Sequence, residues 1–198
     1  MHLIFNHPKI NNKKEEKGLS LIESAMVLAL AATVTAGVMF YYQAASDSNK
    51  TQAAISEVMS ATSAINGLYI GQNGYGGLRA DVLKNSSAIP DNYKKGSGIT
   101  NPFGGQLEVG VPTGSPGYGY HLSLTSLPKS ACISLATLNL GTSAYGYGIG
   151  ITNMDNPGFS DSGSGSGTSL AKKSALSPSD ASGVCRDGND NKVTYFMK

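Results

Sequence analysis

The sequence predicts an α+β protein in which one long N-terminal helix packs against a mostly antiparallel β-sheet. Three observations support this prediction. An uncharged run covers residues 24–46, apolar residues recur at helical spacing within residues 52–69, and several later stretches alternate between apolar and polar or glycine residues. A spacing of three to four residues is typical of a helix with one buried face, and a period of two is typical of a half-buried strand.

The uncharged run is long enough to cross a membrane. An α-helix rises about 1.5 Å per residue, so roughly 20 residues span the hydrocarbon core. Four lysines lie within residues 9–17, before the run, and Tyr41 and Tyr42 lie near its end. The positive-inside rule therefore places the N-terminus in the cytoplasm and the rest of the chain outside. A secretory signal peptide is the alternative, but its apolar core is shorter, so a membrane anchor is favoured.

The helix is expected to continue beyond the membrane segment. The predicted buried stripe comprises Ile55, Val58, Met59, Thr62, Ile65 and Tyr69. The predicted solvent face carries Asp47, Lys50 and Glu57. A single helix over residues 19–66 would be roughly 70 Å long and could not bury itself. Two helices hinged near residues 46–48 are the alternative, because Ser and Asp there lower the helix propensity.

The remaining chain predicts strands, one helix and loops. Strand patterns cover residues 107–111, 118–125, 145–151 and 193–197, and a helix is predicted for residues 128–140. Residues 71–101 are predicted to form a long loop with a short helical piece at 78–83. Residues 101–105 are predicted to form a turn, and residues 161–168 a flexible surface loop. Ser177 and Pro178 are typical of the start of a short helix that leads into Cys185.

The composition argues against several classes of protein. The net charge is only +2 and charged residues make up 14% of the chain, which disfavours nucleic-acid binding. Two cysteines cannot form a four-thiolate zinc site. Of the three histidines, two lie at the extreme N-terminus, which leaves His121 alone. We therefore expect no metal, no cofactor, no catalytic residues and no enzymatic activity.

The two cysteines, Cys132 and Cys185, fall on the outer side of the membrane by the topology argument. Thiols in an oxidising compartment tend to pair, so a disulfide between them is expected. A closed ring of roughly 54 residues contributes on the order of 4 kcal/mol in the loop-entropy model. Two buried free thiols are the alternative.

Glu23 interrupts the apolar sequence near its start. An ionised carboxylate in a membrane helix is costly and is a functional candidate by default, although it could also lie at the interface. If the chain began at Leu19, a new positive amine would appear a few positions before the acid. A neighbouring copy could then offer that amine as a partner for Glu23.

Residues 17–23, KGLSLIE, resemble the processing site of type IV prepilins. A leader of 18 residues, and Leu rather than Phe at the new start, resemble the type IVb branch. Further segments are similar to the bundle-forming pilins of enteric bacteria: LSLIESAMVLALAATVTAGVMFYYQ, ISEVMSATSAINGLYIGQ, SAIPDNY, ITNPFGG, SLATLNLGTSA and NKVTYFMK.

This resemblance implies a division of the chain and a set of site residues. Residues 1–18 would be a leader, 19–46 the membrane and filament-core half of the helix, and 47–198 the globular domain. A prepilin peptidase would cut between Gly18 and Leu19 and methylate the new amine of Leu19. Glu23 would set the register of assembly. The cysteine pair would bound a variable region over residues 132–185.

The resemblance also implies a function and partners. The chain would be the major subunit of a type IVb pilus, a homopolymer used for adhesion, bundling and microcolony formation. Its partners would be the peptidase, an inner-membrane assembly platform with its ATPase, an outer-membrane secretin, a periplasmic thiol oxidase and host or neighbouring-pilus surfaces. The alternatives are a pseudopilin or minor pilin of a secretion system, a conjugative thin-pilus subunit, and a membrane-anchored periplasmic binding protein.

Overall fold

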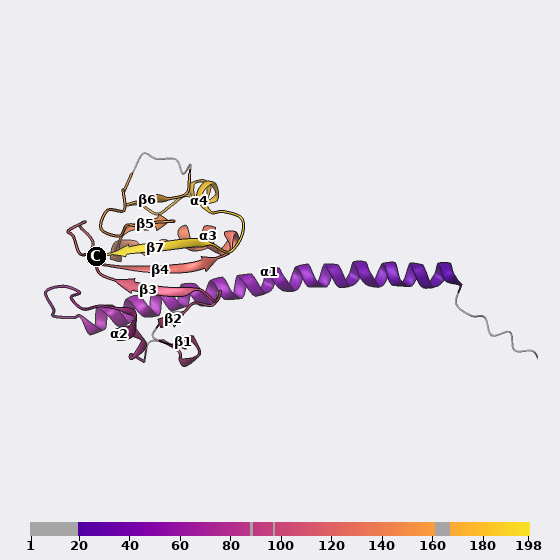
Figure 1. The fold of residues 1–198 in the computed structure, drawn as a ribbon, viewed down its shortest axis with the longest axis horizontal. Helices are drawn as coiled ribbons and strands as arrows, with labels where there is room; N and C mark the ends of the chain where they lie inside the picture. The colour runs from indigo at the N-terminus through magenta and orange to yellow at the C-terminus, as the bar shows by residue number, and fades with distance from the viewer. Residues whose placement is uncertain (1–19, 88, 97, 161–166) are drawn as a thin grey trace, which may run out of the picture. The chain divides into compact units, whose positions relative to one another are not determined.

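The computed structural model of the protein describes residues 20–87, 89–96, 98–160 and 167–198. Gly18, Leu19 and most of the predicted loop at 161–168 lie outside these residues. The chain divides into two compact units, Met1–Gln43 and Ala44–Lys198. Beyond Ser20, the described part of the first unit belongs to helix α1, and the second unit contains the sheet (Figure 1).

Helix α1 covers Leu21–Leu68 without interruption, so the alternative of two hinged helices is wrong. The Ser and Asp residues at 46–48 are accommodated inside it, where the hydroxyl of Thr51 donates to the carbonyl of Asp47 at 2.8 Å. The helix ends two residues later than predicted, and the next glycine, Gly71, has a left-handed φ of 79°.

The buried face of α1 differs from the predicted stripe. Its members are Ala54, Glu57, Val58, Ala61 and Ile65. The prediction was wrong for Met59, whose exposed fraction is 58%, and for Glu57, whose exposed fraction is 4%. Alanine occupies two positions of this face, so the buried residues are not simply the largest apolar ones.

Within the described residues, seven antiparallel strands form one sheet in the order β1-β2-β3-β4-β7-β5-β6. The strands are β1 Lys94–Lys95, β2 Gly98–Thr100, β3 Gln106–Gly110, β4 Tyr120–Leu127, β5 Ala144–Ile149, β6 Leu170–Lys172 and β7 Asn191–Met197. The four predicted stretches correspond to β3, β4, β5 and β7. The other three strands are too short to leave a periodic pattern in the sequence.

The shorter helices are α2 (Ala80–Lys84), α3 (Lys129–Ala136) and α4 (Pro178–Val184), with 3₁₀ turns η1 (Asp91–Tyr93) and η2 (Gly141–Ser143). Helix α4 begins as predicted, with the Ser177 hydroxyl accepting the amide hydrogen of Asp180 at 3.1 Å. Helix α3 ends four residues earlier than predicted. Beyond it the amide of Leu140 donates instead to the Tyr147 hydroxyl, at 2.8 Å.

Side chains are packed on both faces of the sheet. Tyr195 of β7 belongs to the main core, together with Val58 and Ile65 of α1. Phe196, the next residue, points to the opposite face. It joins a second cluster with Tyr118, which precedes β4, Ile151, which follows β5, and Ala171 of β6. Apolar side chains therefore pack against both faces of β7.

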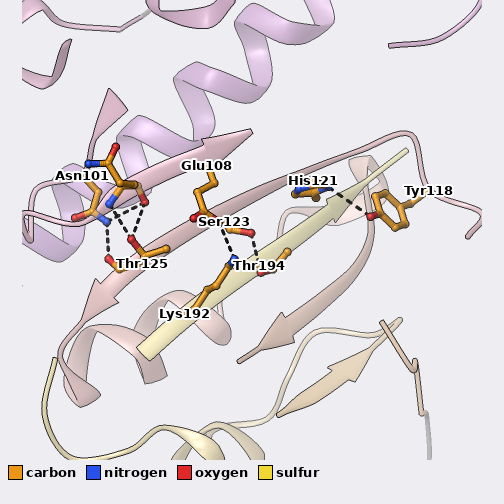
Figure 2. Close-up of polar contacts among 9 residues, drawn as sticks. Asn101, Glu108, Tyr118, His121, Ser123, Thr125, Lys192 and Thr194 are labelled. Atoms are coloured by element: carbon orange, nitrogen blue, oxygen red, sulfur yellow. Dashed lines mark hydrogen bonds and ion pairs between the residues drawn. The ribbon is translucent and has the colours of Figure 1, made fainter. Parts of the chain in front are cut away.

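The predicted turn at residues 101–105 is a buried corner. The side-chain oxygen of Asn101 accepts the amides of Phe103 and Gly105 at 2.9 and 3.1 Å, and its side-chain nitrogen donates to the Thr125 carbonyl at 2.7 Å (Figure 2). A Cβ on Gly105 would lie 2.0 Å from the same carbonyl oxygen. One asparagine thus ties the β2–β3 connection to strand β4.

The C-terminus is held by the loop that follows α1. The hydroxyl of Tyr75 donates to the Lys198 carbonyl at 2.9 Å, and its ring lies 4.6 Å from the ring of Tyr120. A Cβ on Gly119 would lie only 2.6 Å from the Tyr75 ring, so glycine permits this contact. The end of β7 is therefore fixed by a residue far away in the sequence.

Candidate functional site

The apolar segment of α1, residues 21–43, exposes its large side chains. By length and composition, α1 is long and apolar enough to cross a membrane, with a mean hydropathy of 1.8 over its most apolar stretch. The exposed residues are Leu21, Ile22, Met26, Val27, Leu28, Leu30, Val34, Val38, Met39, Phe40, Tyr41 and Tyr42. An apolar surface of this size requires lipid or protein to cover it.

Glu23 closes the first turn of α1. Its carboxylate accepts the amide hydrogen of Ser20 at 3.1 Å, and the Ser20 carbonyl accepts the amide hydrogen of Ser24 at 3.0 Å. This is half of a capping box, in which an acid at the third helical position binds the amide of the cap residue. The sequence analysis missed this role, although the pattern Ser-x-x-Glu is its usual signal. A carboxylate in the first turn also interacts favourably with the helix dipole.

The predicted disulfide between Cys132 and Cys185 is present, with their Cα atoms 6.0 Å apart. Cys132 lies in α3 and Cys185 directly follows α4, and both are buried. The bond encloses the span that contains β5, β6 and α4 and joins its two ends beside the start of β7.

The start of β7 is anchored next to the disulfide. Asn191 accepts the amide of Arg186 at 2.7 Å, and its side-chain nitrogen donates to the carbonyls of Leu127 and Arg186 at 3.0 and 2.9 Å. A half-buried ion pair between Lys172 and Asp180, at 2.8 Å, joins β6 to α4. The disulfide-enclosed region is therefore held at its start, its end and its middle.

A row of polar side chains crosses the face of the sheet opposite α1 (Figure 2). Lys192 of β7 donates to Glu108 of β3 at 2.7 Å, and the hydroxyls of Ser123 and Thr194 share a hydrogen bond at 2.8 Å. Ser123 and Thr194 are a cross-strand pair on neighbouring strands, and such pairs stabilise a sheet by a few tenths to about 1 kcal/mol each. The Lys192–Glu108 ion pair reaches across β4, which lies between β7 and β3.

His121 lies in the same row and is half-buried rather than a free surface residue. Its ring nitrogen is 3.4 Å from the Tyr118 hydroxyl. Burial, and then Lys192, lower the pKa of His121, while Glu108 and Asp155 act in the opposite direction. The imidazole is therefore neutral at pH 7. In the part of the chain that the structure describes, no three metal-ligating side chains gather at one place.

Glu57, which was predicted to lie on the solvent face of the helix, is a buried carboxyl group. It lies on the sheet-facing side of α1, and neither carboxylate oxygen has a hydrogen-bond partner among the described residues. Burial raises the pKa of Glu57 from its ordinary value of 4.5 to about 8. An unpaired buried charge is very costly, so the group keeps its proton at neutral pH.

Comparison with known proteins places these features in a family. The family model described as Bundlin matches residues 43–198. The chain is 64% identical over 193 residues to the major structural subunit of bundle-forming pilus from Escherichia coli O111:H-. It has the same identity to the subunit of that description from strain E2348/69 of Escherichia coli O127:H6. Each alignment covers 96% of this chain and 98% of the relative.

Solved structures support the fold. The type IV b pilin from Salmonella typhi aligns with a TM-score of 0.50 at 16% identity, over 76% of this chain and 99% of that one. TcpA, a type IV pilin from Vibrio cholerae El Tor, aligns with a TM-score of 0.53 at 14% identity, with the same coverage. The predicted fold, a long N-terminal helix on a mostly antiparallel sheet, is confirmed.

Replacing Cys132 by Ser is expected to abolish stable protein. Opening the ring costs on the order of 4 kcal/mol, a large part of the 5–15 kcal/mol typical of a domain. The subunit level in cells and the midpoint of thermal unfolding test this. The double variant Cys132→Ser/Cys185→Ser should be no worse than the single one, because both lack the same bond. Wild-type levels of the single variant would contradict the prediction.

The buried Glu57 is expected to make folding stability fall as pH rises. Because its pKa is about 8 when folded, the folded chain holds a proton that the unfolded chain releases above its ordinary pKa. The stabilising effect of this proton is fully present below pH 4.5. Between pH 4.5 and pH 8 the free energy of unfolding falls by on the order of 1 kcal/mol per pH unit. Urea unfolding of the detergent-solubilised chain at several pH values measures this.

The contribution of Glu57 is obtained by subtracting the free energy of unfolding of the Glu57→Gln variant from that of the wild type at each pH. His121, which is held neutral, contributes a slope of the opposite sign near pH 6 that cancels in this difference. Asp190→Asn, which removes an exposed carboxylate, should keep the wild-type slope. A difference that stays constant between pH 5 and pH 8 would show that Glu57 is ionised in the folded chain.

Proposed function

The chain belongs to the bundlin family, and we propose that it is the major structural subunit of a type IVb pilus, polymerised into surface fibres for adhesion, bundling and microcolony formation. The observation that supports this most strongly is the 64% identity over 193 residues to major subunits of bundle-forming pilus. A second is the exposed apolar segment of α1, which a fibre of many copies would cover.

Before assembly, residues 21–43 anchor the subunit in the inner membrane. The lysines within residues 9–17 favour a cytoplasmic N-terminus, and the unit from Ala44 onward then lies in the periplasm. The disulfide fits this placement, because a periplasmic thiol oxidase is the expected source of a Cys132–Cys185 bond. After assembly the subunit is extracellular.

Processing at Gly18 prepares the subunit for assembly. A prepilin peptidase cuts after this glycine and methylates the amine of Leu19. The cut removes four lysines and two glutamates, which leaves 11 basic and 11 acidic residues. With a net charge near zero, little long-range repulsion opposes the packing of copies or the lateral bundling of fibres.

Glu23 then sets the register between copies. In lipid, both the Glu23 carboxylate and the new amine are costly while unpaired, and pairing between copies relieves both. Only one axial stagger brings the two groups together, so the pair selects that stagger. Repetition of the same head-to-tail contact gives an open helical fibre.

The remaining partners follow from this function. An inner-membrane platform with an ATPase supplies subunits, an outer-membrane secretin passes the fibre, and host cells or neighbouring pili bind its surface. A structural role implies no substrate, and we infer no catalytic residue, cofactor or nucleic-acid partner.

Intact mass spectrometry on protein sheared from the cell surface tests the proposal. The expected chain begins at Leu19, carries one added methyl group and lacks two hydrogens because of the disulfide. Processed protein that stays in the membrane fraction, with none on the surface, would favour a pseudopilin. Surface protein that still carries residues 1–18, in cells with the peptidase, would refute the family's processing pathway for this chain.

Replacing Glu23 by Val is expected to leave cleavage intact and abolish fibres, as judged by the mass of the subunit and by electron microscopy. Because Glu23 also caps α1 through Ser20, this variant removes two interactions. Glu23→Gln separates them, since glutamine can accept the same amide hydrogen but has no charge. Loss of fibres in both variants supports charge pairing; abundant fibres with Gln would reduce Glu23 to a helix cap.

A further inference from the structure

The sequence contains the dipeptide Asn-Gly at two places, Asn66-Gly67 and Asn73-Gly74. An asparagine that precedes glycine is prone to lose its side-chain amide, because the glycine has no Cβ to hinder the approach of its backbone nitrogen to that amide. The two pairs offer the same chemistry within a few residues of each other. The structure places them in different conformations, and this difference decides which of them can react.

The first pair, Asn66-Gly67, lies near the end of α1. Asn66 is exposed, so water reaches its side chain. A helix, however, holds ψ near about −42°, which keeps the backbone nitrogen of Gly67 away from the side-chain carbonyl carbon of Asn66. The N–H of Gly67 also lies within the helix, where amide hydrogens donate to carbonyls four residues earlier. The helix therefore protects Asn66, although the residue is exposed.

The second pair, Asn73-Gly74, lies in the exposed loop between α1 and α2, outside any helix or strand. Among the described residues, neither the Asn73 side chain nor the N–H of Gly74 forms a hydrogen bond. Gly74 has a φ of 140°, and a Cβ placed on it would have no heavy atom within 4 Å. Neither hydrogen bonds nor neighbouring atoms therefore prevent the Gly74 nitrogen from approaching the Asn73 side chain.

We propose that Asn73 is a site of spontaneous deamidation. The backbone nitrogen of Gly74 attacks the side-chain carbonyl carbon of Asn73, and the new C–N bond closes a cyclic imide. The side-chain nitrogen leaves as ammonia and takes the proton that the Gly74 nitrogen gives up. Water then adds to either imide carbonyl and breaks its bond to nitrogen. The products are aspartate and isoaspartate, in which the main chain runs through the former side-chain carbon. The chain and water are the reactants.

The modification falls in the segment that holds the C-terminus. Tyr75, two residues after Asn73, donates from its hydroxyl to the Lys198 carbonyl at 2.9 Å, and its ring lies 4.6 Å from the Tyr120 ring. Both products add a negative charge to this loop, and isoaspartate also adds a carbon atom to the main chain. The reaction therefore alters the covalent link between α1 and the residue that fixes the end of β7. The inference does not rest on the proposed function.

Peptide mapping by mass spectrometry tests the proposal on the detergent-solubilised full chain, incubated at neutral pH and sampled over time. Cleavage after Tyr69 places the two asparagines on separate peptides. In the folded chain, the Asn73 peptide should convert several-fold faster than the Asn66 peptide. In urea, α1 no longer protects Asn66, and the two rates should become similar. An isoaspartyl methyltransferase should label the converted Asn73 peptide, because opening of the imide yields isoaspartate as well as aspartate.

Three results would overturn the proposal. The first is an equal rate at Asn66 and Asn73 in the folded chain. The second is an Asn73 peptide that stays intact in the folded chain over the time in which the unfolded chain converts. The third is conversion to aspartate without isoaspartate, which would indicate direct hydrolysis by water in place of attack by Gly74.

Two variants assign the reaction to the residue. Asn73→Gln keeps an amide in the loop, but its longer side chain closes the ring far more slowly, so conversion of this peptide should be lost. Asn66→Gln makes the same change in α1 and should leave the rate at Asn73 unchanged. If the peptide from Asn73→Gln still converts at the wild-type rate, the reacting amide belongs to the neighbouring Gln72 and the assignment to Asn73 is wrong. The measurement uses the unassembled subunit, so failure to form fibres would bear on the proposed function alone.

Discussion

Strand β7 joins the two halves of the sheet, because it pairs with β4 on one side and β5 on the other. In Figure 1 it is the yellow strand between them. Its start is fixed by Asn191 beside the disulfide, and its end is fixed by Tyr75 from the loop after α1. The two halves of the sheet therefore join only when the last residues of the chain are in place. The fold thus depends on contacts between residues that are distant in sequence.

The disulfide gains its importance from this arrangement. By joining α3 to the end of α4, it brings the start of β7 close to strand β4. A subunit that must persist outside the cell, where no chaperone refolds it, benefits from a bond that limits the unfolded state. On the other half of the sheet, the side chain of buried Asn101 joins the β2–β3 connection to β4 through hydrogen bonds.

Helix α1 has two requirements that a single chain does not meet. In the second unit it buries one face against the sheet and places the protonated Glu57 there. Its apolar segment has no cover within its own unit. Lipid before assembly and other copies afterward would supply that cover.

The sequence by itself determined the features that depend on local pattern. These are the apolar segment, the four longer strands, the cap of α4 and the processing motif that points to the family. It also predicted the pairing of Cys132 and Cys185, because two cysteines allow one bond. It could not determine the order of strands, the three short strands or the end of α3, which depend on partners far away in the chain. Nor could it determine which face of α1 is buried: Glu57 lies inward and Met59 outward, and only tertiary packing decides that rotation.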